Sequence, residues 1–172
     1  MNENMKEIKI RRSIRNFIDK QVSRDDIDLL IRAGMQAPSA MNRKPWCFMV
    51  IDDEVAMNKL FSHPAFTGKI KEAKAFILVL ADLDKTTSRL FHQDLAAATQ
   101  NILLEATHLG IGSYWIGVYE TDTRYDAVKE IFNLPTNIEP FSLVALGYPK
   151  STDEFYFRDN YDPSVIKYNG WE

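Results

Sequence analysis

The segment from Ser88 to Leu109 constrains the fold most strongly, because apolar residues cover most of the helix surface that its spacing predicts. A helix of this kind must be covered nearly all round by other parts of the molecule. We therefore expect a central helix, capped by Gly110, whose run from Ala96 to Ala98 also suits a close dimer contact. The main apolar row, at intervals of three and four residues, consists of Phe91, Leu95, Ala98, Ile102, Ala106 and Leu109.

Four apolar runs predict buried strands around this helix, at residues 46–51, 75–81, 112–119 and 139–146. We expect the first to be buried on both faces, because it is continuously apolar. Shorter helical patterns occupy residues 5–14, 23–35, 52–61 and 121–132, whereas residues 65–73 stay open between a short helix and a loop. A chain of 172 residues with this content is most simply a single domain, residues 1–172.

Charge and composition argue against several classes of function. The net charge is -3 at pH 7, so no broad basic field exists to hold a nucleic acid backbone. No apolar run approaches the roughly 20 residues that a membrane helix needs. The single cysteine, Cys47, rules out an intrachain disulfide and fits a reducing compartment. Because the first seven residues carry no signal peptide, we expect a cytoplasmic protein that binds neither nucleic acid nor membrane.

A basic cluster near the N-terminus, residues 11–17, reads Arg-Arg-Ser-Ile-Arg-Asn-Phe. Guanidinium forks and a hydroxyl match the donors that a phosphate requires. Ile14 and Phe17 are three residues apart, so we expect them to anchor one face of a helical turn while the charged groups project into a pocket. The alternative is a solvated basic turn with no ligand.

A second stretch, residues 37–46, is predicted to be a loop with a defined path, because Pro38 and Pro45 bracket small and polar residues. Such loops present backbone N–H groups and short side chains to ligands, although a plain connector between helix and strand is the alternative. Farther along, Gly117 lies among residues that favour strands. A glycine there indicates a place where something approaches the backbone closely.

The last segment, residues 151–172, has no helical or strand period but is rich in aromatic residues. Each ring contributes on the order of 2 kcal/mol when it is buried. We therefore expect an arm that packs along the body or crosses to a second subunit, and the alternative is a tail that closes its own domain. The rings are those of Phe155, Tyr156, Phe157, Tyr161, Tyr168 and Trp171.

Taken in this order, the stretches resemble the FMN-dependent nitroreductase family over almost the whole chain. Its more specific motifs are residues 11–17 and 37–46, and its weaker ones are residues 109–112, 115–117 and 146–149 after the Ala-rich helix. The resemblance implies an α+β fold with a central, mostly antiparallel sheet wrapped by helices. It also implies an obligate, domain-swapped homodimer that exchanges C-terminal arms and holds two FMN cofactors at the subunit interface.

The resemblance assigns residues to the phosphate end of FMN. Arg11 and Ser13 would bind the phosphate and the ribityl chain, with Arg12 in the same region. A basic residue after the Gly-Tyr-Pro turn often completes the phosphate clamp in the family. Arg158 is the candidate here, although Asn160 lies near the expected place.

The resemblance also assigns residues to the flavin ring. Arg15 would reach the pyrimidine edge, and a guanidinium there would favour two-electron reduction. Ile116 and Gly117 would pass along one side of the ring and offer a backbone N–H toward N5. Lys44 stands where many members have Gln, which alters the charge near the site. The partner subunit would line the flavin with its loop residues Pro38, Ser39, Ala40 and, nearby, Asn42.

The implied function is an FMN-dependent NAD(P)H oxidoreductase that reduces nitroaromatic, quinone or similar electron-poor acceptors by a ping-pong two-electron mechanism. Hydride would pass through flavin N5, so we expect no catalytic side chain, and His63, His92 and His108 lack the spacing of a metal site. No glycine-rich dinucleotide turn distinguishes NADH from NADPH. Three alternatives stay open: a reductive dehalogenase or flavin-fragmenting relative, a non-catalytic flavin-binding redox sensor, and a structural protein with a surface Arg cluster.

Overall fold

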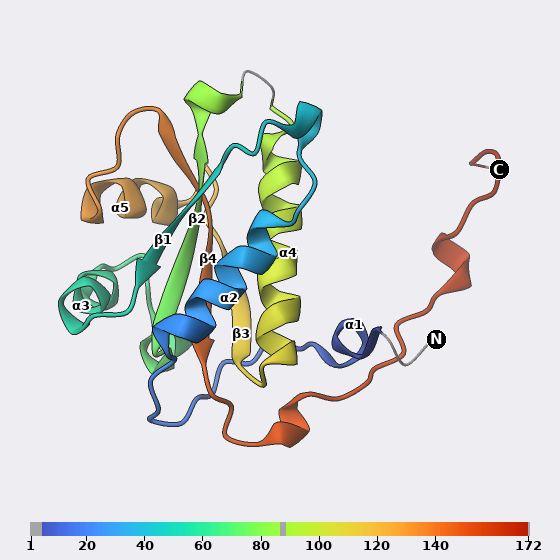
Figure 1. The fold of residues 1–172 in the computed structure, drawn as a ribbon, viewed down its shortest axis with the longest axis horizontal. Coiled ribbons are helices and arrows are strands. Elements are labelled where there is room, and N and C mark those ends of the chain that lie inside the picture. Colours follow the sequence, from blue (N-terminus) through green and yellow to red (C-terminus); the bar gives the residue numbers. More distant parts are fainter. Residues whose placement is uncertain (1–4, 87–88, 172) are drawn as a thin grey trace.

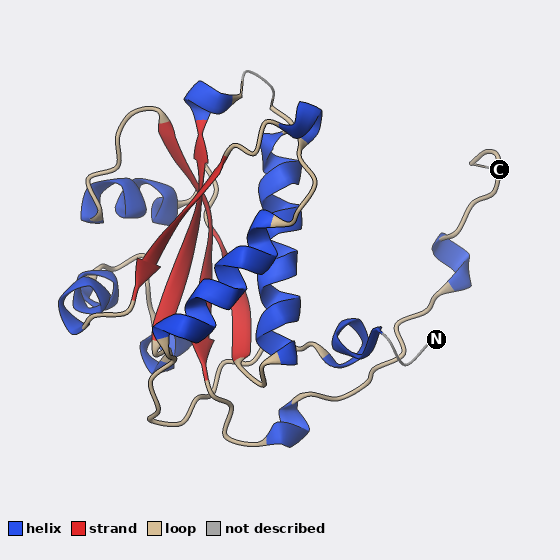
Figure 2. Ribbon diagram, viewed as in Figure 1, coloured by secondary structure: helices blue, strands red, loops and turns tan. Residues whose placement is uncertain are grey.

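The structure, a computed structural model, describes residues 5–86 and 89–171 and is built on a four-stranded sheet. The strands lie in the order β1-β2-β4-β3, and each neighbouring pair is antiparallel. Helices cover both faces of the sheet (Figure 2), which confirms the predicted α+β fold with an antiparallel central sheet. The strands are β1 (Trp46–Ile51), β2 (Ala75–Asp82), β3 (Gly112–Gly117) and β4 (Ile138–Gly147).

Helices α2 and α4 pack against each other on one face of the sheet, and α3 and α5 lie on the other (Figure 1). Three of them begin where the sequence predicts, because Ser23, Asp53 and Asp122 each accept a hydrogen bond from a backbone N–H of the first turn. None of the described helices is long and apolar enough to cross a membrane. The α-helices are α1 (Lys6–Ile10), α2 (Arg24–Met35), α3 (Glu54–Ser62), α4 (Phe91–His108) and α5 (Thr123–Ile131).

Helix α4 is the predicted central helix. The side chains of Leu95, Ala98 and Ile102 are fully buried, and the helix contacts α2 and the sheet. It begins at Phe91, whereas the predicted start at Ser88 lies outside the described residues. Gly110 follows with a φ of 70°, in the left-handed region that a helix C-terminal cap requires.

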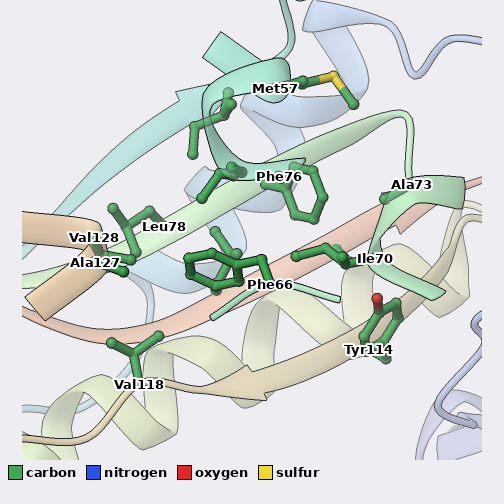
Figure 3. Close-up of a cluster of buried hydrophobic side chains, with 14 of the residues drawn as sticks. Met57, Phe66, Ile70, Ala73, Phe76, Leu78, Tyr114, Val118, Ala127 and Val128 are labelled. Carbon is green, nitrogen blue, oxygen red and sulfur yellow. The ribbon is translucent and has the colours of Figure 1, made fainter. Parts of the chain in front are cut away.

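Strand β2 divides the core between the two faces of the sheet. Phe76 and Leu78 point into the cluster beneath α3 and α5 (Figure 3), and Ile77 and Val79 point into the cluster beneath α2 and α4. This alternation is the two-residue period of a strand. Strand β1, by contrast, lies at the sheet edge and leaves Val50 37% exposed, so the prediction that it is buried on both faces is wrong. An apolar run does not reveal whether a strand has one neighbour or two.

Two further predictions of local structure need correction. Helix α1 ends at Ile10, and residues 11–17 are extended instead of forming a helical turn. They are extended because Ser13 pairs with Ser113 and Phe17 pairs with Pro149. Both partners are distant in the sequence, so the local residue pattern could not predict these contacts. Strand β3 ends at Gly117, short of the predicted residue 119. Residues 65–73, left open above, contain a 3₁₀ turn over Gly68–Glu72.

The C-terminal arm runs away from the body of the molecule (Figure 1). Residues 156–171 are all exposed, and Tyr168 and Trp171 are 81% and 85% exposed. Phe155 is partly buried against the core of its own chain, but the arm beyond it does not close that fold. The rings after Phe155 remain available for contact with another surface.

Candidate functional site

Residues 11–17 are held firmly on the sheet. The backbone N–H of Ile14 donates to the carbonyl oxygen of Ser113 at 3.0 Å, and the side chains of Ile14 and Phe17 are buried as predicted. Gly147 makes room for Phe17, since a Cβ there would lie 2.6 Å from Cγ of its ring. Anchoring by the two apolar residues leaves the neighbouring arginines at the surface of the fold.

Arg11, Arg12 and Arg158 line one groove of about 320 Å³ between α1 and the start of the arm. The Arg12 guanidinium lies over the ring of Tyr156 at 4.5 Å, and Nη2 of Arg158 donates to the hydroxyl of the same tyrosine at 3.3 Å. Tyr156 thus holds two guanidinium groups close together. Asp159 lines the same groove, yet in the part of the chain that the structure describes no carboxylate forms an ion pair with these arginines.

The hydrogen bonding of Arg12 is incomplete. Its Nη1 donates to the carbonyl oxygens of Lys9 and Arg11, but Nε and Nη2 are buried and have no partner among the described residues. Buried donors without acceptors carry a free-energy cost that a ligand can remove. A phosphate oxygen is an acceptor that suits a charged guanidinium, so the chemistry of the groove fits a phosphate group.

A second cavity, of about 220 Å³, lies next to strand β3. Arg15 reaches into it with its guanidinium 5.1 Å from the ring centre of Tyr114, while its Nη1 donates to the carbonyl oxygen of Ser13 at 3.2 Å. Burial raises the pKa of Tyr114 to about 12, against the opposing effect of Arg15, so the phenol stays neutral at physiological pH. The other lining residues are Ala65, Phe66, Thr67, Ile70, Ile116 and Arg124.

Gly117 leaves open space at the end of β3. A Cβ built at this position meets no atom within 4 Å, and the residue is exposed. Ile116 lines the adjoining cavity. The backbone at Gly117 is therefore open to close approach, and the predicted ligand contact there stays a prediction.

The predicted loop, residues 37–46, is ordered by two hydrogen bonds. The backbone N–H of Ala40 donates to Oδ1 of Asp94 at 2.9 Å, and that of Lys44 donates to Oγ of Ser39 at 2.9 Å. Asn42 adopts a positive φ of 56°, which an asparagine tolerates. Pro38 and Asn42 are exposed, so part of the loop surface is free in a single chain.

Within a single chain, the loop of residues 37–46 lies far from the arginines of residues 11–17. The loop contacts the first turn of α4 through Asp94, whereas Ile14 is bonded to Ser113, just beyond the other end of α4 (Figure 1). A helix of 18 residues is about 27 Å long. Two predicted halves of one site, the arginines and the residues Pro38, Ser39, Ala40 and Asn42, therefore lie far apart in the single chain.

Of the residues that line the β3 cavity, sequence reasoning named only Arg15 and Ile116, and it missed the three polar ones Thr67, Tyr114 and Arg124 as well as the apolar ones. Thr67 and Tyr114 carry no local signal, since they reach the cavity through long-range packing. Arg124 did carry one, because a cation in the first turn of a helix opposes the helix dipole and needs a reason to be there. Within the described residues, no three His, Cys, Asp or Glu side chains gather to hold a metal ion.

A sequence profile of the nitroreductase family matches residues 8–87 and 56–148. The chain belongs to the nitroreductase family. A relative from Archaeoglobus fulgidus, named "Putative NADH dehydrogenase/NAD(P)H nitroreductase", is 43% identical over 174 residues. That alignment covers 99% of this chain and 100% of the relative.

Two solved nitroreductase-like structures share the fold. A "Putative NADH Oxidase" from Clostridium acetobutylicum is 40% identical, with a TM-score of 0.89 over 96% of this chain and 99% of that one. "A putative nitroreductase in complex with fmn" from Desulfovibrio desulfuricans is 26% identical, with a TM-score of 0.83 over 100% and 99% of the two chains. Fold and family predictions are thereby confirmed, and a structure of the same fold binds FMN.

Proposed function

We propose that this protein is an FMN-dependent NAD(P)H oxidoreductase that reduces nitroaromatics, quinones or similar electron-poor acceptors. The observation that carries the proposal is the groove in which Arg11, Arg12 and Arg158 gather. Asp159 also lines this groove, but none of the three arginines forms an ion pair with a carboxylate of the described residues. A dianionic phosphate satisfies such a group of cations, and FMN ends in one. The FMN bound to a relative of the same fold supports the same choice of cofactor.

In this proposal the protein binds and orients the cofactor. Arg11, Arg12, Ser13 and Arg158 hold the phosphate end, and Arg15 faces the pyrimidine edge of the ring. The ring passes Ile116 and Gly117, where a backbone without a side chain permits close approach. When bound, FMN supplies the redox chemistry, taking a hydride from NAD(P)H and passing two electrons to the acceptor. Donor and acceptor use the same place in turn, so no catalytic side chain is required.

We further propose that the active form is a homodimer with swapped arms. The partner subunit would supply the loop residues Pro38, Ser39, Ala40 and Asn42. Within one chain these residues lie at the N-terminal end of α4, far from the arginines near its C-terminal end. Dimerisation would also cover the exposed rings of the arm, each worth on the order of 2 kcal/mol when buried. The proposed location is the cytoplasm.

The absorption spectrum of the purified protein tests the cofactor. We expect a yellow protein whose flavin bleaches on addition of NADH or NADPH and recovers when nitrobenzene or benzoquinone is added. The double variant Arg11→Ala, Ser13→Ala should lose FMN, whereas Arg32→Ala, an exposed change on α2, should retain it. A colourless protein that cannot be loaded with FMN overturns the proposal. Flavin binding without steady-state oxidation of NAD(P)H would instead favour a redox sensor.

A further inference from the structure

Two guanidinium groups from distant parts of the chain share the cavity beside β3. Arg15 comes from the N-terminal stretch and Arg124 from the first turn of α5, 109 positions later by residue number. The remaining lining residues are uncharged, so no carboxylate faces the cavity from its own wall. The two guanidinium groups make the cavity basic, although the carboxylate of Asp122, which is not among the lining residues, pairs with Arg124 and offsets part of this charge.

Three hydrogen bonds, to Asp122 and Gly117, hold Arg124 in place. Its Nη1 donates to Oδ2 of Asp122 at 2.9 Å and to the carbonyl oxygen of Gly117 at 3.4 Å. Asp122 is also the N-cap of α5, accepting the backbone N–H of Arg124 at 2.9 Å. The guanidinium thus lies beside the residue whose open backbone the flavin ring is proposed to approach.

The stability of α5 does not explain why an arginine is present in its first turn. A cation in the first turn of a helix interacts unfavourably with the positive end of the helix dipole, by a few tenths of a kcal/mol to about 1 kcal/mol. Asp122 offsets this in part, but the side chains of Arg124 and Asp122 are 39% and 33% exposed, and exposed ion pairs contribute little. A function at the cavity is the better explanation.

We propose that Arg124 is a second positively charged residue of the flavin site and that it raises the reduction potential of bound FMN. The inference rests on the proposed function. The oxidised flavin ring is neutral, whereas two-electron reduction places negative charge on it. A cation near the ring therefore stabilises the reduced form selectively, and Asp122 opposes that effect.

Three substitutions separate charge from structure. Arg124→Gln removes the cation, Arg124→Lys keeps it, and Asp122→Asn removes the opposing carboxylate while keeping a good N-cap residue. For each we would measure the midpoint potential of bound FMN and the Kd of oxidised FMN. Arg32→Gln, an exposed change of the same charge on α2, is the matched control.

We expect Arg124→Gln to lower the midpoint potential and to reduce the affinity for reduced FMN, relative to oxidised FMN, by about tenfold. Arg124→Lys should stay close to the wild type, Asp122→Asn should shift the potential upward, and Arg32→Gln should change nothing. The shift in Arg124→Gln should shrink as salt concentration rises, since the side chain is partly exposed.

Equal potentials in the wild type and Arg124→Gln would overturn the assignment, even if the variant bound some acceptors less tightly. If Arg124→Gln fails to fold, an Asp122→Asn protein with an unchanged potential overturns it equally. A wild-type protein that binds no FMN refutes the proposed function itself, whereas normal FMN binding with no response to these changes refutes only the role of Arg124.

Discussion

The carboxylate of Asp94, in the first turn of α4, accepts a hydrogen bond from the backbone N–H of Ala40 at 2.9 Å. Asp94 is only 6% exposed, so this contact ties the loop of residues 37–46 to the central helix from within the fold. Asp94→Ala should cost about 1–3 kcal/mol in the free energy of unfolding, because the partly buried N–H of Ala40 loses its acceptor. Asp94→Asn keeps an acceptor and should cost less. Urea denaturation measures both.

The loop itself gives a second readout of the Asp94 contact. Arg43 is exposed, and trypsin cleavage after it should quicken in Asp94→Ala, since proteolysis follows the population of the open loop. Asp28→Ala, an exposed change on α2, should leave the cleavage rate as it is. Equal cleavage in all three proteins would mean that Asp94 does not order the loop.

Gly147 and Phe17 are packed too closely for any larger residue at position 147. A Cβ there would lie 2.6 Å from Cγ and 2.8 Å from Cδ1 of the Phe17 ring. Gly147→Ala should therefore destabilise the protein by about 1–3 kcal/mol through overpacking. Adding Phe17→Leu should cost less in this background than in the wild type, because the smaller side chain relieves the overlap. Additive costs in a double-mutant cycle would contradict the contact.

Substitution of Gly117, unlike that of Gly147, should have little effect on stability. A Cβ there meets no atom within 4 Å, so Gly117→Ala should change the free energy of unfolding by no more than about 0.5 kcal/mol. FMN affinity should nevertheless fall, because the new methyl group occupies the space through which the ring is proposed to approach the backbone. Fluorescence titration with FMN measures this, with Arg32→Ala, an exposed change on α2, as the control. Wild-type affinity in Gly117→Ala would remove Gly117 from the site.

Local chemistry explains which parts of the fold the sequence could predict. Ser23, Asp53 and Asp122 begin their helices because each cap needs only its own first turn. The strand β2 is predictable for a similar reason, since a long apolar run flanked by turn residues suits a covered strand.

Long-range contacts explain what the sequence could not predict. The spacing of Ile14 and Phe17 fits a helical turn, but pairing with Ser113 and Pro149 holds that stretch extended. Arg124 lies seven positions after Gly117, yet the turn into α5 brings its guanidinium back to that carbonyl. The basic cluster itself could be recognised because its chemistry is contained in consecutive residues.

Glu7 and His108 link α1 to the end of α4 in a pH-dependent way. Nδ1 of His108 lies 3.0 Å from Oε1 of Glu7. The hydrogen bond to Glu7, with a contribution from the charge of Glu105, raises the pKa of His108 above 6.5, and the same bond lowers the pKa of Glu7 below 4.5. The His108 contribution is complete below pH 6.5 and is lost as pH rises through its raised pKa. The Glu7 contribution is present above pH 4.5 and is lost as pH falls through its lowered pKa.

The stability difference between the wild type and Glu7→Gln should therefore be largest between pH 4.5 and pH 6.5 and should shrink at higher pH. Nuclear magnetic resonance titration should show the pKa of His108 falling in Glu7→Gln. Glu105→Gln removes the same charge without the hydrogen bond and should lower that pKa less. An equal effect of the two variants would rule out the hydrogen bond as the main cause.

The separation of Ala40 from Ile14 along α4 makes a two-chain site testable by mixing inactive proteins. One variant carries Arg11→Ala and Ser13→Ala, and the other carries Ser39→Ala and Asn42→Ala. If each site takes its arginines from one subunit and its loop from the partner, neither variant alone should hold FMN well. Co-refolding equal amounts should restore FMN to roughly a quarter of the sites, because half of the dimers are mixed and each mixed dimer has one intact site. Equilibrium dialysis with FMN measures the recovery, and a site built within one chain would recover nothing on mixing.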